Sequence, residues 1–301
     1  MIAGMTNGVE RPMHNQSEWS RDTIPPKDAA PEIVFGPTRG WITLNLGEVW
    51  AHRELLFFLA WRDIKVRYKQ TIIGAAWAML KPIMTMVIFS TIFGSLIGVP
   101  SGDVPYPIFV YTALISWSFF ASALGQSGSS LVANASLISK VYFPRLVLPI
   151  ASVFVAAVDF ALAFLVLLAL MLWYGIIPGS ALLALPLFLL LAVTTALGAG
   201  LWLSALEIKY RDVGHIVPFL TQFWLYATPV IYPSSIIPER WRLLYSLNPM
   251  VGVVEGFRWS LLGTAHSPAR QIIISTIIVV IMLIGGLFFF RRAEREFADV
   301  V

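Results

Sequence analysis

Long apolar stretches separated by short polar segments dominate this chain. Five stretches contain no Asp, Glu, Lys or Arg, and the longest is broken by Tyr174-Gly175 and Pro178-Gly179, which favour a tight turn. Crossing a bilayer takes about 20 apolar residues, so the pattern predicts an all-α integral membrane protein with six transmembrane helices. These are expected at residues 82–99, 107–130, 149–174, 181–206, 216–232 and 271–290. A transmembrane β-barrel would show alternating segments of about 10 residues and is excluded.

The Lys and Arg residues are distributed unevenly over the connections between these helices. Of the 21, all but four fall before the first helix, after the last, or in the two loops on the same side as the termini. The remaining four lie within residues 233–270. Under the positive-inside rule, this bias predicts that the N- and C-termini are both cytoplasmic.

The polar segment before the first membrane helix has two parts. Residues 1–31 are polar and rich in Pro, which predicts a disordered cytoplasmic tail. Residues 32–81 form a further cytoplasmic segment, which leads into a six-helix membrane domain at residues 82–301.

A helical pattern runs from Arg53 to Lys69. Apolar residues recur at positions i, i+4, i+7 and i+11, while cations occupy other faces. This predicts an amphipathic helix on the cytoplasmic membrane surface, with aromatic side chains toward the membrane and cations toward water. A packed helix of a small soluble domain is the alternative. The residues concerned are Phe57, Trp61, Ile64 and Tyr68, with Arg62 and Arg67 among the cations.

The loop between the second and third membrane helices carries aromatic residues beside cations. A short helix is expected from Asn134, as its N-cap, to about Val141, before Pro144 interrupts it. Exposed aromatic residues after this helix would suit docking to a soluble partner, and a plain interfacial turn is the alternative. The candidate docking residues are Lys140, Tyr142, Phe143, Pro144 and Arg145.

The external segment 233–262 is semi-apolar and rich in Pro and aromatic residues. Two short helices, at about 236–246 and 250–262, are expected to dip into the outer leaflet as a re-entrant pair that shapes a pathway. Trp241 and Tyr245 are the candidate residues of an external gate.

Aromatic residues also crowd the fifth predicted helix and its exit. Phe223 and Tyr226 lie in mid-span, and Tyr232 lies near the end. Aromatic surfaces inside a channel would let a sugar chain slide, whereas helix packing and an interfacial belt are the ordinary explanations.

Asp159 is the one formal charge deep inside a predicted span. An intramembrane acid is by default a proton or substrate site. A protonated or hydrogen-bonded structural carboxyl is the alternative, because no other span offers an ionisable partner.

Composition narrows the function. The chain is 57% hydrophobic and only 13% charged, which is about half the charge of an ordinary soluble domain and excludes a soluble enzyme. There is no Cys, the four His are scattered without metal-binding spacing, and no Walker A motif occurs. The net charge of +4 is explained by loops that face anionic lipid rather than by nucleic acid.

Several motifs in this order resemble the membrane subunits of type-2 ABC exporters, in the branch that exports polysaccharides and teichoic-acid-like polymers. The resemblance covers about residue 32 to the C-terminus. The motifs are Trp61-Arg-Asp-Ile-Lys-Val-Arg67-Tyr68-Lys69-Gln70-Thr71 with Gly74-Ala-Ala-Trp77 and Lys81-Pro82, Lys140-Val-Tyr-Phe-Pro-Arg145 with Pro149, Tyr210-Arg211-Asp212-Val213, and Leu247-Asn248-Pro249.

The resemblance implies a bacterial inner-membrane homodimer that pairs with two copies of a separate ATPase subunit, which holds the ATP and Mg. It also implies an interface helix at 53–69, an ATPase-coupling helix at 134–145 and external gate helices at 233–262. The function expected is export of a lipid-linked polysaccharide, such as O-antigen or capsule, along a path lined by the first and fifth helices.

Other functions stay open at this point. Within the family, the alternatives are a teichoic-acid, lipid or drug exporter. Outside it, a membrane-embedded glycan enzyme would require clustered carboxylates or His, and a proton-coupled transporter would require several buried ionisable groups.

Overall fold

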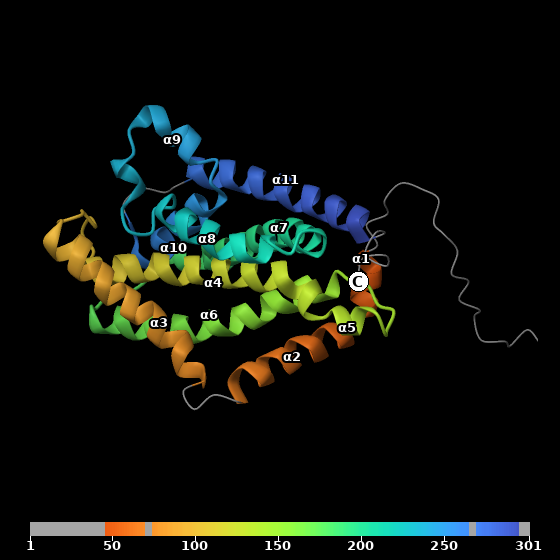
Figure 1. The fold of residues 1–301 in the computed structure, drawn as a ribbon. Coiled ribbons are helices and arrows are strands. Elements are labelled where there is room, and N and C mark those ends of the chain that lie inside the picture. Colours follow the sequence, from red (N-terminus) through yellow and green to blue (C-terminus); the bar gives the residue numbers. More distant parts are fainter. Residues whose placement is uncertain (1–45, 70–73, 265–268, 295–301) are drawn as a thin grey trace, which may run out of the picture. The chain divides into compact units, whose positions relative to one another are not determined.

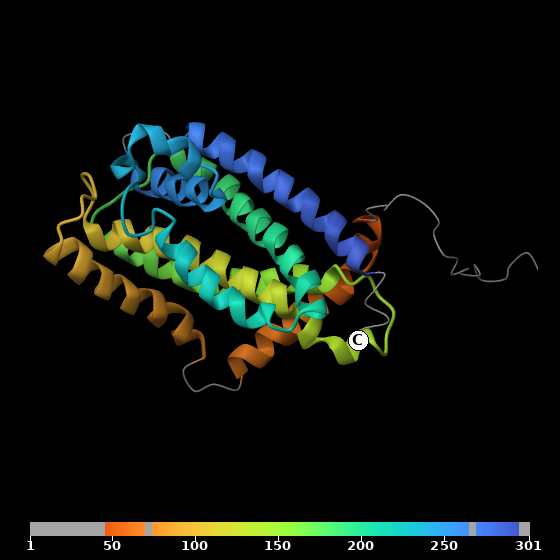
Figure 2. The same ribbon diagram turned by 45° about the horizontal axis from the view of Figure 1, so that its top comes forward.

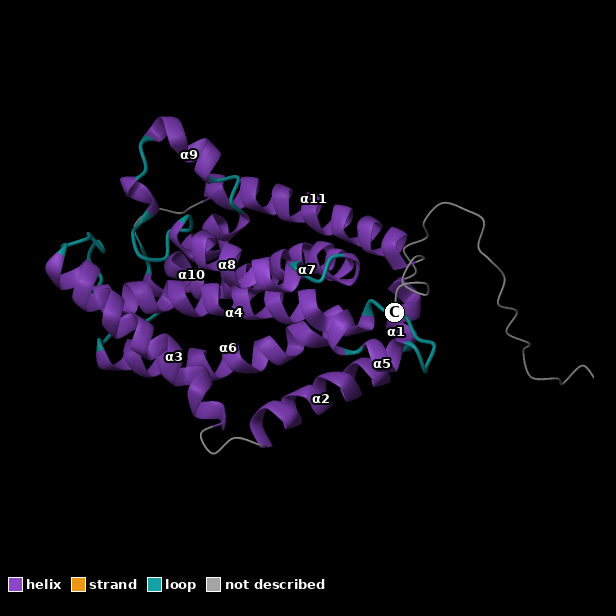
Figure 3. Ribbon diagram, viewed as in Figure 1, coloured by secondary structure: helices purple, strands orange, loops and turns teal. Residues whose placement is uncertain are grey.

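The apolar stretches of the chain fold into long helices. The computed structural model describes residues 46–69, 74–264 and 269–294. Within these ranges the chain consists of helices and loops without strands, as predicted (Figure 3). The expected tail at 1–31 lies outside the described residues.

Five helices in the described ranges are long and apolar enough to cross a membrane, and they confirm five of the six predicted spans. They are α3 (Gly74–Phe89), continued by the π-helical segment Ser90–Leu96, α4 (Tyr106–Ala133), α6 (Val147–Trp173), α7 (Leu185–Lys209), preceded by the 3₁₀ turn Ser180–Ala184, and α11 (Ala269–Glu294).

The span expected at 216–232 is not confirmed as one continuous helix. Helix α8 covers Val213–Tyr226, which is 14 residues. At about 1.5 Å per residue it is too short to cross a hydrocarbon core of about 30 Å. The helix ends at its C-cap Ala227, shortly before Pro229. Proline disfavours the helical conformation in the residue before it, which accounts for this early end.

Helix α4 forms the centre of the bundle. Most of its residues are buried, and it packs against α6 on one side and α7 on the other (Figure 1). Helix α7 then crosses α11 closely. A Cβ atom at Gly198 would lie 3.1 Å from the backbone nitrogen of Leu283, so glycine is what permits this approach.

The N-terminal helices gather at one end of the bundle. Helix α1 (Leu46–Ala51) is joined to the end of α11 by the ion pair of Glu48 with Arg291, at 4.0 Å. Arg145, in the loop after α5 (Ala135–Ile138), donates to the carbonyl of Glu294 at 3.0 Å. The first and last described residues therefore lie at the same end of the bundle (Figure 1).

The predicted helix at 53–69 is present as α2 (Arg53–Lys69), which packs on α6. At the opposite end of the bundle, the two helices expected in the external segment are α9 (Glu239–Tyr245) and α10 (Pro249–Leu262). Figure 2 shows α8 running along the bundle toward that end, where the chain continues into α9.

Candidate functional site

A groove of about 720 Å³ opens between α3 and α8, over the surface of α4 and α6. Hydroxyl and amide groups contribute to its wall from Ser118, Ser122, Thr221 and Gln222. Aromatic rings line it as well, from Trp77, Phe89, Trp117, Phe119, Phe160 and Tyr226. Because the wall combines apolar ring faces with small polar groups, it has the chemistry that a sugar chain needs for stacking and for hydrogen bonds.

The three residues predicted to line a path are not all in this groove. Tyr226 lines it. Phe223 is absent from the lining, is 60% exposed and packs on Phe219, with ring centroids 4.6 Å apart. Tyr232 belongs to the network around α10, where its hydroxyl donates to the carbonyl of Tyr226. One face of α8 thus meets the groove and another faces away from the chain.

Asp159 lies in the groove wall and has two partners from the end of α2. One oxygen accepts a hydrogen bond from the Tyr68 hydroxyl, and the other pairs with Arg67 at 2.9 Å. Burial raises the pKa of Tyr68, and the hydrogen bond to Asp159 raises it further. The other membrane spans contain no ionisable partner for Asp159, because its partners come from the helix that precedes the spans.

Helix α2 meets the bundle with aliphatic side chains and not with its aromatic pair. Leu59 and Ala60 are buried, whereas Phe57 and Trp61 are 68% and 48% exposed and stack on each other. Lys65 lies over the Trp61 ring. The cations of α2 do not all point to water as predicted, since Arg67 pairs with Asp159 and Arg62 donates to Asn134 at 2.8 Å. The aromatic pair is therefore available to lipid or to another chain.

The loop at 134–145 departs from the prediction in three respects. Its helix, α5, is shorter than expected, and the side chain of its N-cap, Asn134, makes no capping bond because it donates to Ser130 and accepts from Arg62. Tyr142 is exposed at 78%, as predicted, but the prediction that Phe143 is exposed is wrong.

Phe143 is only 5% exposed because it packs into a cluster of the same chain. This cluster includes Leu59 of α2, Leu201 of α7 and Phe290 of α11. Of the other candidate docking residues, Lys140 is exposed, Pro144 is buried, and Arg145 bonds to Glu294. Tyr142 and Lys140 remain as the parts of the loop that a partner protein would meet.

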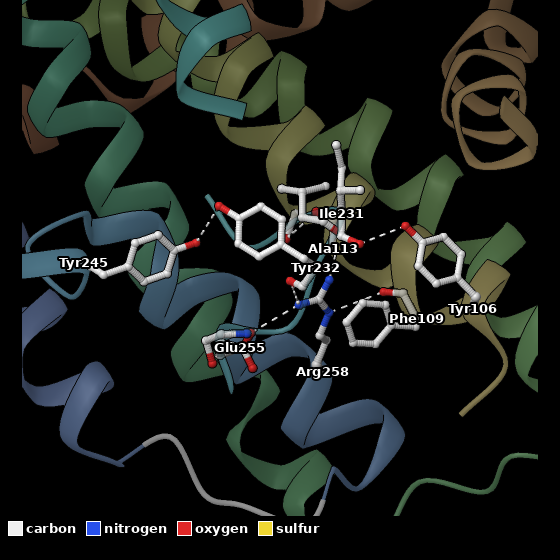
Figure 4. A network of polar contacts seen from close by, with 11 residues as sticks. Tyr106, Phe109, Ala113, Ile231, Tyr232, Tyr245, Glu255 and Arg258 are labelled. Carbon is white, nitrogen blue, oxygen red and sulfur yellow. Dashed lines mark hydrogen bonds and ion pairs between the residues drawn. The ribbon is translucent and has the colours of Figure 1, made fainter. Parts of the chain in front are cut away.

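Arg258 of α10 is the most deeply buried charge of the described residues, at 1% exposure (Figure 4). Its guanidinium donates to the carbonyls of Val230 at 2.7 Å and of Phe109 and Tyr232 at 3.4 Å. It also pairs with Glu255 at 3.2 Å and lies over the Phe109 ring. One side chain therefore ties α10 to the start of α4 and to the segment that follows α8.

Tyrosine hydroxyls extend this network toward α9 (Figure 4). Tyr245 donates to the Tyr232 hydroxyl at 3.2 Å, and Tyr106 donates to the carbonyl of Ile231 at 2.8 Å. Burial raises the pKa of Tyr245, and the hydrogen bond to Tyr232 adds to the shift. The predicted gate residues Trp241 and Tyr245 both line a second, apolar groove of about 470 Å³. Trp241 is half exposed there, whereas Tyr245 is also tied into the hydrogen-bond network through Tyr232.

Sequence reasoning overlooked Arg258 and Glu255. Arg258 counts among the external cations, yet it is sealed inside the protein. A signal was available, because Glu255 and Arg258 are three residues apart on an otherwise apolar helix with Gly252 and Gly256. That glycine spacing is typical of close helix packing, so a charged pair beside it was a candidate for burial.

Comparisons with known proteins agree with this architecture. The model of the ABC-2 type transporter family matches residues 54–262. An O-antigen export system permease protein of Myxococcus xanthus is 31% identical over 214 residues, covering 70% of this chain and 81% of that protein. A protein of the same description from Klebsiella pneumoniae is also 31% identical, covering 71% and 81%. The polysialic acid transport protein KpsM of Escherichia coli is 26% identical, covering 67% and 78%.

Proposed function

The chain belongs to the ABC-2 type transporter family of membrane permeases, and from this we propose that it is the transmembrane subunit of an ATP-driven exporter of a lipid-linked polysaccharide. The relatives described as O-antigen and polysialic acid transporters support a polymeric sugar as cargo. The observation that carries the proposal is the long groove whose wall combines aromatic rings with hydroxyl and amide groups.

A sixth crossing of the inner membrane is formed by α8 together with the segment that follows it. Helix α8 supplies about 21 Å of rise, and the buried residues 228–231 continue the path. An even number of crossings agrees with the first and last described residues lying at one end of the bundle. The excess of Lys and Arg at that end makes it cytoplasmic.

Helices α9 and α10 re-enter the outer leaflet as an external gate. Helix α10 is almost wholly buried, and it contacts the start of α4 through Arg258 and the start of α11 through Gly252. Backbone polar groups at membrane depth are tolerated only where protein covers them, and this packing provides that cover.

The channel is formed by two copies of the chain. Within one chain the groove is open on the side between α3 and α8, and α8 turns an apolar face outward with Phe219, Phe223 and Ile216 each about half exposed or more. A second copy that covers this side closes the groove into a path. Each copy contributes α3 and α8, which are the first and fifth spans of the prediction.

A separate ATPase subunit, holding ATP and Mg, docks on the cytoplasmic end of each copy. Tyr142 and Lys140 present an exposed ring and a cation there, beside the cluster that buries Phe143. Movement of the ATPases would reach the membrane helices through that cluster, because it joins the loop to α2, α7 and α11.

The test compares two aromatic residues of α8. Tyr226→Ala removes a ring from the groove wall, so surface polysaccharide should fall several-fold in cells that depend on this chain, while the amount of protein in the membrane stays normal. Phe223→Ala, on the other face, should change dimer formation more than it changes the groove. Normal export by a well-expressed Tyr226→Ala, Gln222→Ala double variant would overturn the proposed path.

A further inference from the structure

Two cations line the groove. Lys81 comes from α3, and Arg67 comes from the last turn of α2. Lys81 is exposed, and its side chain makes no ion pair with the residues that the structure describes. Since Arg67 is matched by Asp159, the groove lining keeps one uncompensated positive charge. Such a cavity attracts an anion.

The pair of Arg67 with Asp159 is held in place yet remains reachable. The Arg67 side chain is 42% exposed and that of Asp159 is 18% exposed. Tyr68 binds the other carboxylate oxygen, so Asp159 keeps one partner even if Arg67 is taken from it. A guanidinium carries five N–H donors in a planar fork, which suits phosphate as well as carboxylate.

We propose that Lys81 and Arg67 bind the phosphate or diphosphate ester that joins lipid to glycan, and that this anion replaces Asp159 as the counter-ion of Arg67. The inference rests on the proposed function and names the part of the substrate that these two cations hold. The glycan then extends from the phosphate along Ser118, Thr221 and Gln222.

The exchange has a consequence for α2. With Arg67 taken by phosphate, Asp159 holds α2 to α6 through Tyr68 alone, while Arg62, in the middle of the helix, still binds Asn134. Leu59, about one turn before Arg62, packs in the cluster that contains Phe143 of the coupling loop. Arrival of a lipid phosphate is in this way transmitted to the surface where the ATPase docks.

The test uses the dimer with its ATPase subunits in phosphatidylcholine nanodiscs, and the probe is radiolabelled geranylgeranyl-diphosphate N-acetylglucosamine. Lys81→Gln and Arg67→Gln should each weaken binding of the probe about tenfold, because each removes a charge-assisted contact. Asp159→Asn should tighten it, because the competing anion is gone. Lys69→Gln is the matched control, since Lys69 is an exposed cation on α2 outside the groove lining, and it should leave the affinity unchanged.

If Asp159→Asn fails to fold, Tyr68→Phe tests the same competition between Asp159 and phosphate for Arg67, but it should lower the affinity for the probe where Asp159→Asn should raise it. Without the Tyr68 hydroxyl, Asp159 depends more on Arg67, so phosphate competes less well and binding should weaken. Wild-type affinity in both Lys81→Gln and Arg67→Gln would overturn the inference.

Competition distinguishes the possible sources of the phosphate. Displacement of the probe by inorganic pyrophosphate but not by phosphatidylglycerol supports a substrate phosphate. Displacement by phosphatidylglycerol as readily as by unlabelled probe overturns it in favour of a bulk lipid headgroup. Failure of this inference can be distinguished from failure of the proposed function. If the proposed function is wrong, the Tyr226→Ala, Gln222→Ala variant exports normally; if only this inference is wrong, that variant still loses export.

Discussion

Two of the arginine–carboxylate pairs among the described residues lie in opposite surroundings. At the end of the bundle with α9 and α10, the side chains of Arg258 and Glu255 are 1% and 14% exposed. On the groove side of α2, those of Arg67 and Asp159 are 42% and 18% exposed. Arg258 also has three backbone carbonyls as acceptors, and its guanidinium covers the ring of Phe109.

The difference teaches which contacts can take part in a transport cycle. A buried charge that loses its partner has neither water nor a substitute, so the Arg258 network fixes α10 to α4 and to residues 230–232 as one unit. A half-exposed pair can exchange one partner for another at little cost. Gate movement should therefore carry the Arg258 unit as a whole, whereas the Arg67 pair should be able to exchange partners.

The largest expected effect comes from breaking the buried network. Arg258→Ala leaves Glu255 and three carbonyls without their donor and should lower the free energy of unfolding by about 3–5 kcal/mol. The measurement is thermal unfolding of the purified protein in detergent. Arg242→Ala is the control, because its pair with Glu239 lies at the surface and should contribute less than about 1 kcal/mol. Equal losses in the two variants would remove the distinction between sealed and exposed pairs.

At the cytoplasmic end, the adjacent residues Phe143 and Tyr142 are expected to have different roles, Phe143 in packing and Tyr142 in docking. Phe143→Ala empties a place in the cluster of Leu59, Leu201 and Phe290 and should cost about 3 kcal/mol of stability. Tyr142→Ala removes an exposed ring, so unfolding should stay unchanged while binding of the ATPase subunit weakens. A stable Phe143→Ala protein with weakened ATPase binding would instead restore Phe143 as the docking residue.

The sequence predicts the long helices well because their signal is local. Residues 106–133 need only a count of apolar residues between charges, residues 147–173 need a count that continues across Asp159, and the apolar period of α2 places that helix correctly. The ion pair between α2 and α6 was missed for a physical reason. The period of α2 shows where its own residues lie relative to one another, but the partner of Arg67 is Asp159, which is 92 residues further along the chain.

The same reason applies to the site. The stretch around Phe143 and Tyr142 predicts a turn with aromatic residues, and only contacts with α2, α7 and α11 decide which ring is buried. In the sequence, Arg258 is one more cation of the external segment, and only its contacts with α4 and with the segment after α8 show that it is buried. A single sequence names such residues, but it contains no information on which distant partners meet.

A smaller effect on stability is expected at Gly256, where α10 packs through an apolar contact. At Gly256 an added Cβ would collide with the ring of Phe188, so Gly256→Ala should destabilise the protein by about 1–3 kcal/mol through overpacking. Phe188→Leu in the same chain should recover part of that loss by making room. Gly179→Ala, where a Cβ meets open space, controls for the loss of glycine itself. Without recovery in the double variant, the close contact with Phe188 is not what requires glycine at this position.

The smallest effect on stability is expected at the exposed pair, where the effect on function should be the larger one. Arg67→Gln removes a guanidinium that is 42% exposed, so water takes over much of its role, and Asp159 keeps its hydrogen bond from Tyr68. The free energy of unfolding should fall by about 1 kcal/mol or less. Surface polysaccharide, normalised to protein in the membrane, should nevertheless drop several-fold. Thermal unfolding and export are measured for the same variant. If Arg67→Gln loses as much stability as Arg258→Ala, and if export only follows the amount of folded protein, then the Arg67–Asp159 pair is a structural contact of the same kind as the buried pair.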